Sequence, residues 1–252
     1  MPPSSLPTAS DLPSAFEPVL HPANLSLTQV SNIIVFLPGL GDTSKNFAGF
    51  ARALNLPETL ALTLQPPFPL PVPIGPGFHW SDDLLFDQAT GALDPDSGFA
   101  RVARLLAEDV ISKILLKKCG FKPAEIHLFG FGQGGSAALA AALHPSISSL
   151  SLGSLTSIGG AVPLSTPLPS TDVHKNRTPV LLLGGSRGAL TAQEQSLVKR
   201  TKNSYTFVEY HQWKKADDSL PKSREEALPM MQFFGRRLRS RKGVPDGATE
   251  IG

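Results

Sequence analysis

The sequence contains almost none of the features that would cross-link the chain or hold it in a bilayer. Cys119 is the one cysteine among 252 residues, so an internal disulfide is excluded and a reducing compartment is favoured. The apolar stretch nearest to a membrane span, 136–143, is broken by His144-Pro145. Residues 1–13 lack the basic and apolar segments of a signal peptide. We therefore expect a cytoplasmic protein without a transmembrane segment, with the nucleus as an alternative location.

An excess of charge of either sign is also missing. The 23 basic and 21 acidic residues leave a net charge of +2, so no nucleic-acid partner is expected. From 126 to 171 the chain has no Asp, Glu, Lys or Arg at all, which is typical of the centre of a sheet and the helix that covers it. The histidines do not have the spacing of metal ligands, and no cofactor is expected.

Apolar runs and helical patterns alternate along the chain. The predicted strand 32–37 contains an uninterrupted apolar run, as in a central parallel strand that is buried on both faces. Thr43 or Ser44 can cap the helix that follows. A long helix is predicted over 97–118, ended by Gly120. Further strands are expected at 60–64, 125–131, 154–162, 179–184 and 205–210, and an edge hairpin at about 15–27.

Three more helices complete the pattern. One is expected over 133–143, and two begin at the capping boxes Thr191-x-x-Glu194 and Ser223-x-x-Glu226. Strands that alternate with helices predict a mostly parallel sheet with helices on both faces. We expect one α/β domain over 14–241, between a disordered arm (1–13) and a disordered tail (242–252).

The predicted strand 125–131 runs into Gly130-Phe131-Gly132-Gln133-Gly134. A strand, a tight turn and a small-residue helix form the layout of a G-x-S-x-G nucleophile elbow, whose middle residue carries the reactive hydroxyl at the top of a sheet. The middle residue here is Gly132, which has no side chain. The frame of the motif is therefore present without its nucleophile.

Four motifs occur in the order and register of a known family. They are Phe36-Leu37-Pro38-Gly39-Leu40-Gly41-Asp42-Thr43, Trp80-Ser81-Asp82, Asp96-Ser97-Gly98-Phe99 and Gly130-Phe131-Gly132-Gln133-Gly134-Gly135. Over about residues 15–240 the chain resembles the phospholipase/carboxylesterase branch of the α/β-hydrolases, which includes the acyl-protein thioesterases. The resemblance implies the α/β-hydrolase fold.

Members of that family hydrolyse esters or thioesters with a Ser-His-Asp triad. The resemblance implies that the nucleophile position is Gly132 and that the acid position, after the strand 179–184, is Gly188. Counted from the end of the strand 205–210, the base position is Lys215, with His211 and Trp213 close by. All three triad members are therefore expected to be replaced.

The resemblance also implies which groups could still bind a ligand. The backbone amides of Leu40 and Gln133 correspond to the oxyanion donors, and a backbone N–H survives any change of side chain except to proline. Trp80 corresponds to a residue of the ligand site.

Other side chains are alternatives for the missing groups, although each also has a plain structural explanation. These alternatives are Ser136 or Ser186 as a relocated nucleophile, His211 or His79 as its base, and Asp172 as a displaced acid. His127 lies inside a predicted strand and is expected in the core. Cys119 has no histidine near it in sequence, so a thiol nucleophile is not expected.

These observations predict a hydrolase-fold protein without hydrolase chemistry, which binds an acyl chain, an acylated peptide or a protein partner. The alternative is an active ester or thioester hydrolase with a relocated serine. The proline-rich segment 66–76 is either a stiff surface connection or one wall of an apolar groove. The basic run 236–242 either complements the dipole at a helix end or forms a nuclear-localisation or anionic-surface patch.

Overall fold

The computed structural model describes residues 3–22, 25–72, 74–85, 94, 96–171, 174–192 and 194–242. Within them, one sheet of seven strands has the order β1-β3-β2-β6-β7-β8-β9. Its strands are β1 (Val19–His21), β2 (Asn32–Leu37), β3 (Thr59–Thr63), β6 (Ile126–Phe131), β7 (Ser154–Ile158), β8 (Val180–Gly184) and β9 (Val208–Gln212). β1 runs antiparallel to β3, and the other neighbouring pairs are parallel. The mostly parallel sheet expected from the sequence is confirmed.

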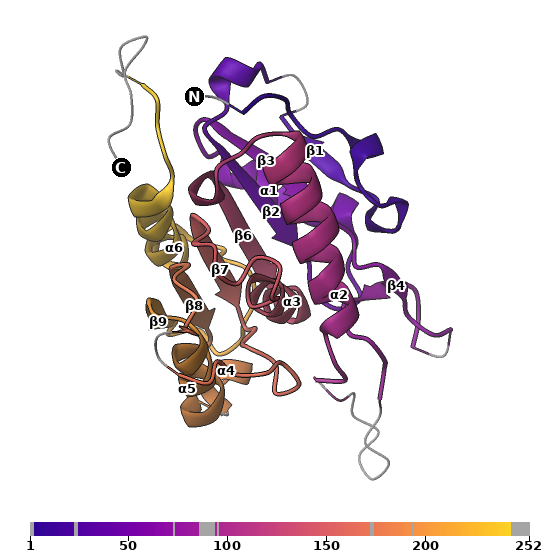
Figure 1. The fold of residues 1–252 in the computed structure, drawn as a ribbon. Coiled ribbons are helices and arrows are strands. Elements are labelled where there is room, and N and C mark those ends of the chain that lie inside the picture. Colours follow the sequence, from indigo (N-terminus) through magenta and orange to yellow (C-terminus); the bar gives the residue numbers. More distant parts are fainter. Residues whose placement is uncertain are drawn as a thin grey trace.

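Helices cover both faces of this sheet (Figure 1). They are α1 (Ser44–Leu54) and α6 (Arg224–Arg237) on one face, and α2 (Ala100–Arg104) with its continuation η4 (Leu105–Lys118), α3 (Gln133–Ala142) and α5 (Glu194–Ser204) on the other. Side chains alternate between the faces along a strand. In β2, Ile34 and Phe36 therefore pack with Phe47 of α1, whereas Ile33 and Val35 belong to the core cluster under η4 and α3. Among the described helices, none combines the length and the apolar character needed to cross a bilayer.

The long helix predicted over 97–118 is present from Ala100 and changes its hydrogen bonding along its length. η4 is a π-helix, in which the N–H of Cys119 reaches back five residues to the carbonyl of Ile114 at 2.8 Å. Gly120 follows with φ of +72°, a conformation that favours glycine, and the predicted stop is confirmed.

The predicted helix caps have mixed outcomes. Thr43 caps α1 and Ser223 caps α6, each through a side-chain oxygen that accepts a backbone N–H, at 3.3 and 3.2 Å. The capping box at Thr191 is wrong. Thr191 lies inside α4 (Ala189–Ala192), and its hydroxyl donates instead to the carbonyl of Gly185 at 2.7 Å.

The amino-terminal part of the chain differs from its prediction. Instead of an edge hairpin over 15–27, β1 pairs with β3, which is distant in sequence. Where the composition predicts a disordered arm, residues 3–13 lie along the end of η4: the N–H of Ser4 donates to the carbonyl of Cys119 at 2.7 Å, and Lys118 pairs with Asp11 at 2.5 Å. Leu12 is buried in the main core cluster.

Two other segments fold back on the body of the protein. The proline-rich segment contains a two-stranded ribbon, in which β4 (Phe68–Pro69) pairs with β5 (Phe78–His79). The basic run at the carboxyl end forms ion pairs within the chain, from Arg236 to Glu209 at 2.6 Å and from Arg241 to Glu125 at 3.2 Å. Residues 243–252 of the expected tail are outside the described residues.

Candidate active site

The turn between β6 and α3 has the shape of a nucleophile elbow. Gly132, the residue between the two elements, has φ of +51° and ψ of −118°, a conformation that side chains rarely adopt. Its N–H donates to the carbonyl of Ile158 in β7 at 2.7 Å. Apart from its two chain neighbours, no atom of the described residues lies within 4 Å of a Cβ built on Gly132. The space that a nucleophilic side chain would use is therefore open.

The neighbouring glycines of the motif are needed for close packing. A Cβ on Gly130 would lie 2.4 Å from the carbonyl oxygen of Gly134, and a Cβ on Gly134 would lie 2.3 Å from the carbonyl oxygens of Leu37 and Pro38. The loop after β2 thus approaches the first turn of α3 at backbone distance. This approach brings the Leu40 and Gln133 segments to the same end of the sheet.

The two predicted oxyanion donors are available. Within the described part of the chain, neither the N–H of Leu40 nor that of Gln133 makes a hydrogen bond. Trp80 connects their segments: its Nε1–H donates to the carbonyl of Pro38 at 2.7 Å, and its backbone N–H donates to Gln133 Oε1 at 2.8 Å. Trp80 is fully buried, so it positions the donor segments through contacts inside the protein.

A carboxylate that the sequence patterns did not single out lies beside Gly188, the expected acid position. A Cβ on Gly188 would lie only 1.8 Å from Asp218 Oδ1. The Asp218 carboxylate accepts hydrogen bonds from the N–H groups of Gly185 and Ala189, both at 2.8 Å. The available signal was that Asp217 and Asp218 are the only carboxylates between β9 and α6.

Lys215, the residue counted to the base position, turns away from this carboxylate. Its Nζ donates to Glu226 Oε2 at 3.0 Å and to the carbonyl of Ser219 at 2.5 Å. It also lies 4.0 Å from the centre of the Trp213 ring. These partners belong to α6 and the loop before it, so Lys215 fastens that loop to the helix.

The structure does not assemble the proposed relocated nucleophiles. In the part of the chain that it describes, neither the Ser136 nor the Ser186 hydroxyl bonds an imidazole. His211 is exposed on β9. Asp172 lies outside the described residues.

His79 does bond a serine near the elbow, namely Ser81 at 3.1 Å. The Ser81 hydroxyl donates to the carbonyl of Asp83 at 2.7 Å, so His79 Nδ1–H is the donor in the His79–Ser81 bond. Gln133 Nε2 also donates to Ser81, at 3.2 Å. Burial lowers the pKa of His79, and Ser81 is fully buried. This pair joins the elbow helix to β5 and does not present a hydroxyl to solvent.

The remaining titratable candidates are structural. His127 is buried between Ser154 Oγ at 2.8 Å and Asn32 Oδ1 at 3.4 Å, which confirms its expected place in the core. Burial raises the pKa of the Cys119 thiol. Among the described residues, no group of three His, Cys, Asp or Glu side chains is arranged to hold a metal ion.

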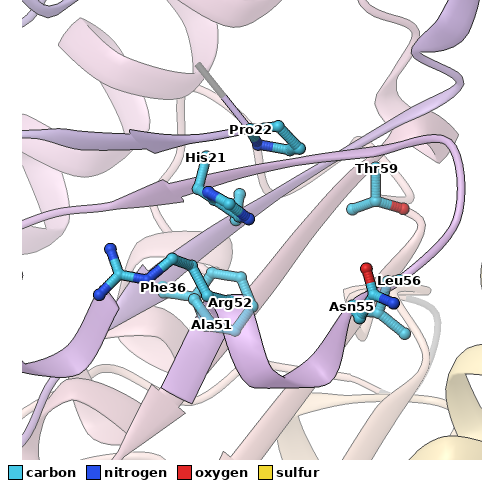
Figure 2. A pocket seen from close by; sticks show the side chains of 9 residues that line it. His21, Pro22, Phe36, Ala51, Arg52, Asn55, Leu56 and Thr59 are labelled. Atoms are coloured by element: carbon cyan, nitrogen blue, oxygen red, sulfur yellow. The ribbon is translucent and has the colours of Figure 1, made fainter. Parts of the chain in front are cut away.

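The hollow drawn in Figure 2 is separate from the elbow. Its lining comes from α1 and the residues after it and from β1, β2 and β3, and includes His21, Arg52 and Thr59. Thr59 opens β3, whereas the elbow follows the carboxyl end of β6. Because β3, β2 and β6 are parallel, Thr59 and the elbow lie at opposite ends of these strands.

Comparisons with known proteins agree with this architecture. A phospholipase/carboxylesterase family model matches residues 26–235. An uncharacterized hydrolase of Schizosaccharomyces pombe is 29% identical over 214 residues, which cover 83% of this chain and 85% of that protein. Another, from Mycosarcoma maydis, is 38% identical over 154 residues, which cover 60% of this chain and 55% of that protein.

Solved structures share the fold at lower identity. Acyl-protein thioesterase 2 of Zea mays has a TM-score of 0.62 at 20% identity, covering 88% of this chain and 99% of that one. A carboxylesterase from Mesorhizobium loti has a TM-score of 0.63 at 18% identity, covering 91% and 98%. Because the family model spans most of the chain and the fold agrees, this protein belongs to the phospholipase/carboxylesterase family of α/β-hydrolases.

Proposed function

We propose that this protein is a non-catalytic member of its family that binds an acyl ligand or an acylated protein partner at the elbow. The observation that carries the proposal is Gly132, which keeps the elbow conformation but offers open space in place of a hydroxyl. Loss of the nucleophile alone costs roughly six orders of magnitude in turnover in a serine hydrolase of the subtilisin type. What remains is binding.

The free N–H groups of Leu40 and Gln133 support the binding of a carbonyl oxygen. Exposed aliphatic side chains lie in the loops that follow β2, β4 and β7, namely Leu40, Val72 and Leu164, which are 42%, 94% and 63% exposed. They suit an acyl chain better than a polar ligand, because burying them is favourable. We also propose a cytoplasmic location for this binding.

The second candidate function is ester or thioester hydrolysis by a relocated serine. The hydrogen bond between His79 and Ser81, close to Gln133, favours this alternative over one that uses Ser136 or Ser186. It would require the buried Ser81 hydroxyl to become exposed and to release the carbonyl of Asp83.

Three measurements on the wild-type chain decide between the proposals. A fluorophosphonate probe should give no stoichiometric label, and p-nitrophenyl and acyl-thioester substrates should be hydrolysed no faster than in buffer. A non-hydrolysable long-chain acyl amide should nevertheless give a saturable heat of binding in calorimetry. A single labelled serine, mapped by peptide mass spectrometry, would replace the first proposal with the second.

A further inference from the structure

The loop after β9 is laid directly along the loop after β8. Three backbone hydrogen bonds join the end of β8 and the loop after it to the loop after β9. They run from Trp213 N–H to the Gly184 carbonyl at 2.8 Å, from Ser186 N–H to the Lys215 carbonyl at 2.8 Å, and from Arg187 N–H to the Ala216 carbonyl at 2.9 Å. By resemblance to the family, the loop after β9 corresponds to the loop that carries the base, and the loop after β8 corresponds to the loop that carries the acid. The two loops therefore form one continuous layer over the carboxyl ends of the parallel strands.

Glycines make this close approach possible. A Cβ on Gly185 would lie 2.2 Å from the carbonyl oxygen of Asp217, and a Cβ on Gly188 would lie 1.8 Å from Asp218 Oδ1. A Cβ on Gly159, at the end of β7, would lie 3.0 Å from Asp218 Oδ2. Gly188 and Asp218 therefore belong together, because the Asp218 carboxylate occupies the space that a side chain at 188 would take.

Asp218 closes the layer with its side chain. One carboxylate oxygen accepts the N–H of Gly185, and the other accepts the N–H of Ala189, the first residue of α4. Hydrogen bonds from N–H groups to an ionised carboxylate are stronger than those between neutral groups. The carboxylate thus bridges both ends of the loop 185–188, which is called the acid loop below.

We infer that Asp218, not Lys215, stands where the family carries its histidine, and that its carboxylate also fills the space of the missing acid side chain. In a triad the base must lie between the acid and the nucleophile. Asp218 is the residue of its loop that faces Gly188, whereas Lys215 points to Glu226. One residue therefore takes the place of two triad members and latches their loops together. This inference rests on the proposed non-catalytic function, because it explains how the space of the triad is filled.

The latch is tested with Asp218→Ala and a matched control, Asp217→Ala. Asp217 is the exposed neighbour whose carboxylate accepts from the Ser219 hydroxyl at 2.9 Å and, among the described residues, makes no hydrogen bond to residues 185–188. In Asp218→Ala the amides of Gly185 and Ala189 should exchange hydrogen at least about tenfold faster, and Tm should fall by roughly 2–8 °C. The control should leave both quantities unchanged. Unchanged exchange in Asp218→Ala would overturn the latch.

The assignment of the histidine place is tested by rebuilding the triad in two ways. One chain carries Gly132→Ser, Gly188→Asp and Asp218→His; the other carries Gly132→Ser, Gly188→Asp and Lys215→His. The first should react with a fluorophosphonate probe and hydrolyse p-nitrophenyl esters at least about 100-fold faster than the wild type. The second should not, because the new carboxylate at 188 meets the resident Asp218.

Circular dichroism and Tm show whether each rebuilt chain is folded. If both rebuilt chains react equally, or if neither reacts, the assignment of the histidine place to Asp218 is rejected. The hydrogen-exchange experiment then still tests whether Asp218 holds the two loops together. A reactive serine in the wild type would overturn the proposed function and would leave the exchange result as it is, so the two failures are distinguishable.

Discussion

At the scale of single residues, Gly132 has kept the backbone of a nucleophile without the side chain. Its φ of +51° lies in the region that a Cβ makes unfavourable. A catalytic serine would have to be held there against that strain, whereas a glycine is not strained. A glycine at this position therefore costs less conformational free energy than a serine would.

Gly132→Ser should therefore lower the free energy of unfolding by about 1–3 kcal/mol, because the space is open and the cost is conformational. Gly132→Ala is the matched variant and should cost about the same, since the Cβ and not the hydroxyl causes the strain. Urea denaturation measures both. A Gly132→Ser chain that is as stable as the wild type would contradict this explanation.

His127 gives the stability a dependence on pH. Burial, with a smaller contribution from the charge of Arg239, lowers the pKa of His127 to about 3 from its ordinary 6.5. Between these values the unfolded chain binds a proton that the folded chain does not. His127 should therefore make the free energy of unfolding decrease as the pH falls from about 6.5 toward 3, by up to about 1.4 kcal/mol per pH unit.

Urea midpoints at about pH 7, 6 and 5 measure this slope. His127→Gln should be less stable at each pH, because it loses the bond to Ser154, but its decline with falling pH should be shallower than that of the wild type. Equal slopes for the two chains would show that His127 is not the group that titrates.

At the scale of elements, the motif Trp80-Ser81-Asp82 turns out to organise a helix start. The Asp82 carboxylate accepts the N–H groups of Ala100 at 2.8 Å and Arg101 at 2.9 Å, and so caps α2 from outside the helix. Unpaired N–H groups at a helix start are costly, and the helix dipole favours a negative charge there.

Asp82→Ala should cost about 0.5–2 kcal/mol of stability through the loss of this cap. Asp83→Ala is the control, because among the described residues the Asp83 carboxylate accepts only the N–H of the next residue, Leu84. Thermal unfolding of the two variants compares them directly. If Asp83→Ala lost more stability than Asp82→Ala, the capping role of Asp82 would be contradicted.

Most elements were predictable because their signals are local. The apolar run of β2, the helical spacing of η4 and the cap residues Thr43 and Ser223 each act within a few neighbouring positions. The edge hairpin was not predictable in this way. β1 has only three residues, and its partner β3 is about 40 positions away, so its pairing depends on the packed sheet.

At the scale of the whole molecule, the elbow depends on close packing between segments that are far apart in the sequence. Gly134 lies against the carbonyl oxygens of Leu37 and Pro38, almost a hundred positions earlier in the chain. Trp80 bonds both sides of this contact. The backbone N–H groups of Leu40 and Gln133 lie at the same end of the sheet because of this packing.

Gly134→Ala should therefore destabilise the protein by about 3 kcal/mol or more, because its Cβ would meet backbone that cannot move away. Gly235→Ala is the matched control, since it is an exposed helix position with nothing within 4 Å of the added Cβ. It should gain about 0.5–1 kcal/mol. Urea unfolding tests both signs, and a tolerated Gly134→Ala would refute the close contact.

The sequence by itself determined the family, most of the strands and helices, and the glycines at 132 and 188, because these depend on local patterns and on the identity of single residues. Only the tertiary structure decided that the Asp218 carboxylate lies beside Gly188, that Lys215 turns to Glu226 and that Trp80 is a buried link. The physical reason is that the path of a loop depends on what it packs against. Counting residues from β9 cannot show which side chain faces Gly188, whereas the glycines at 159 and 188 leave room for the Asp218 carboxylate.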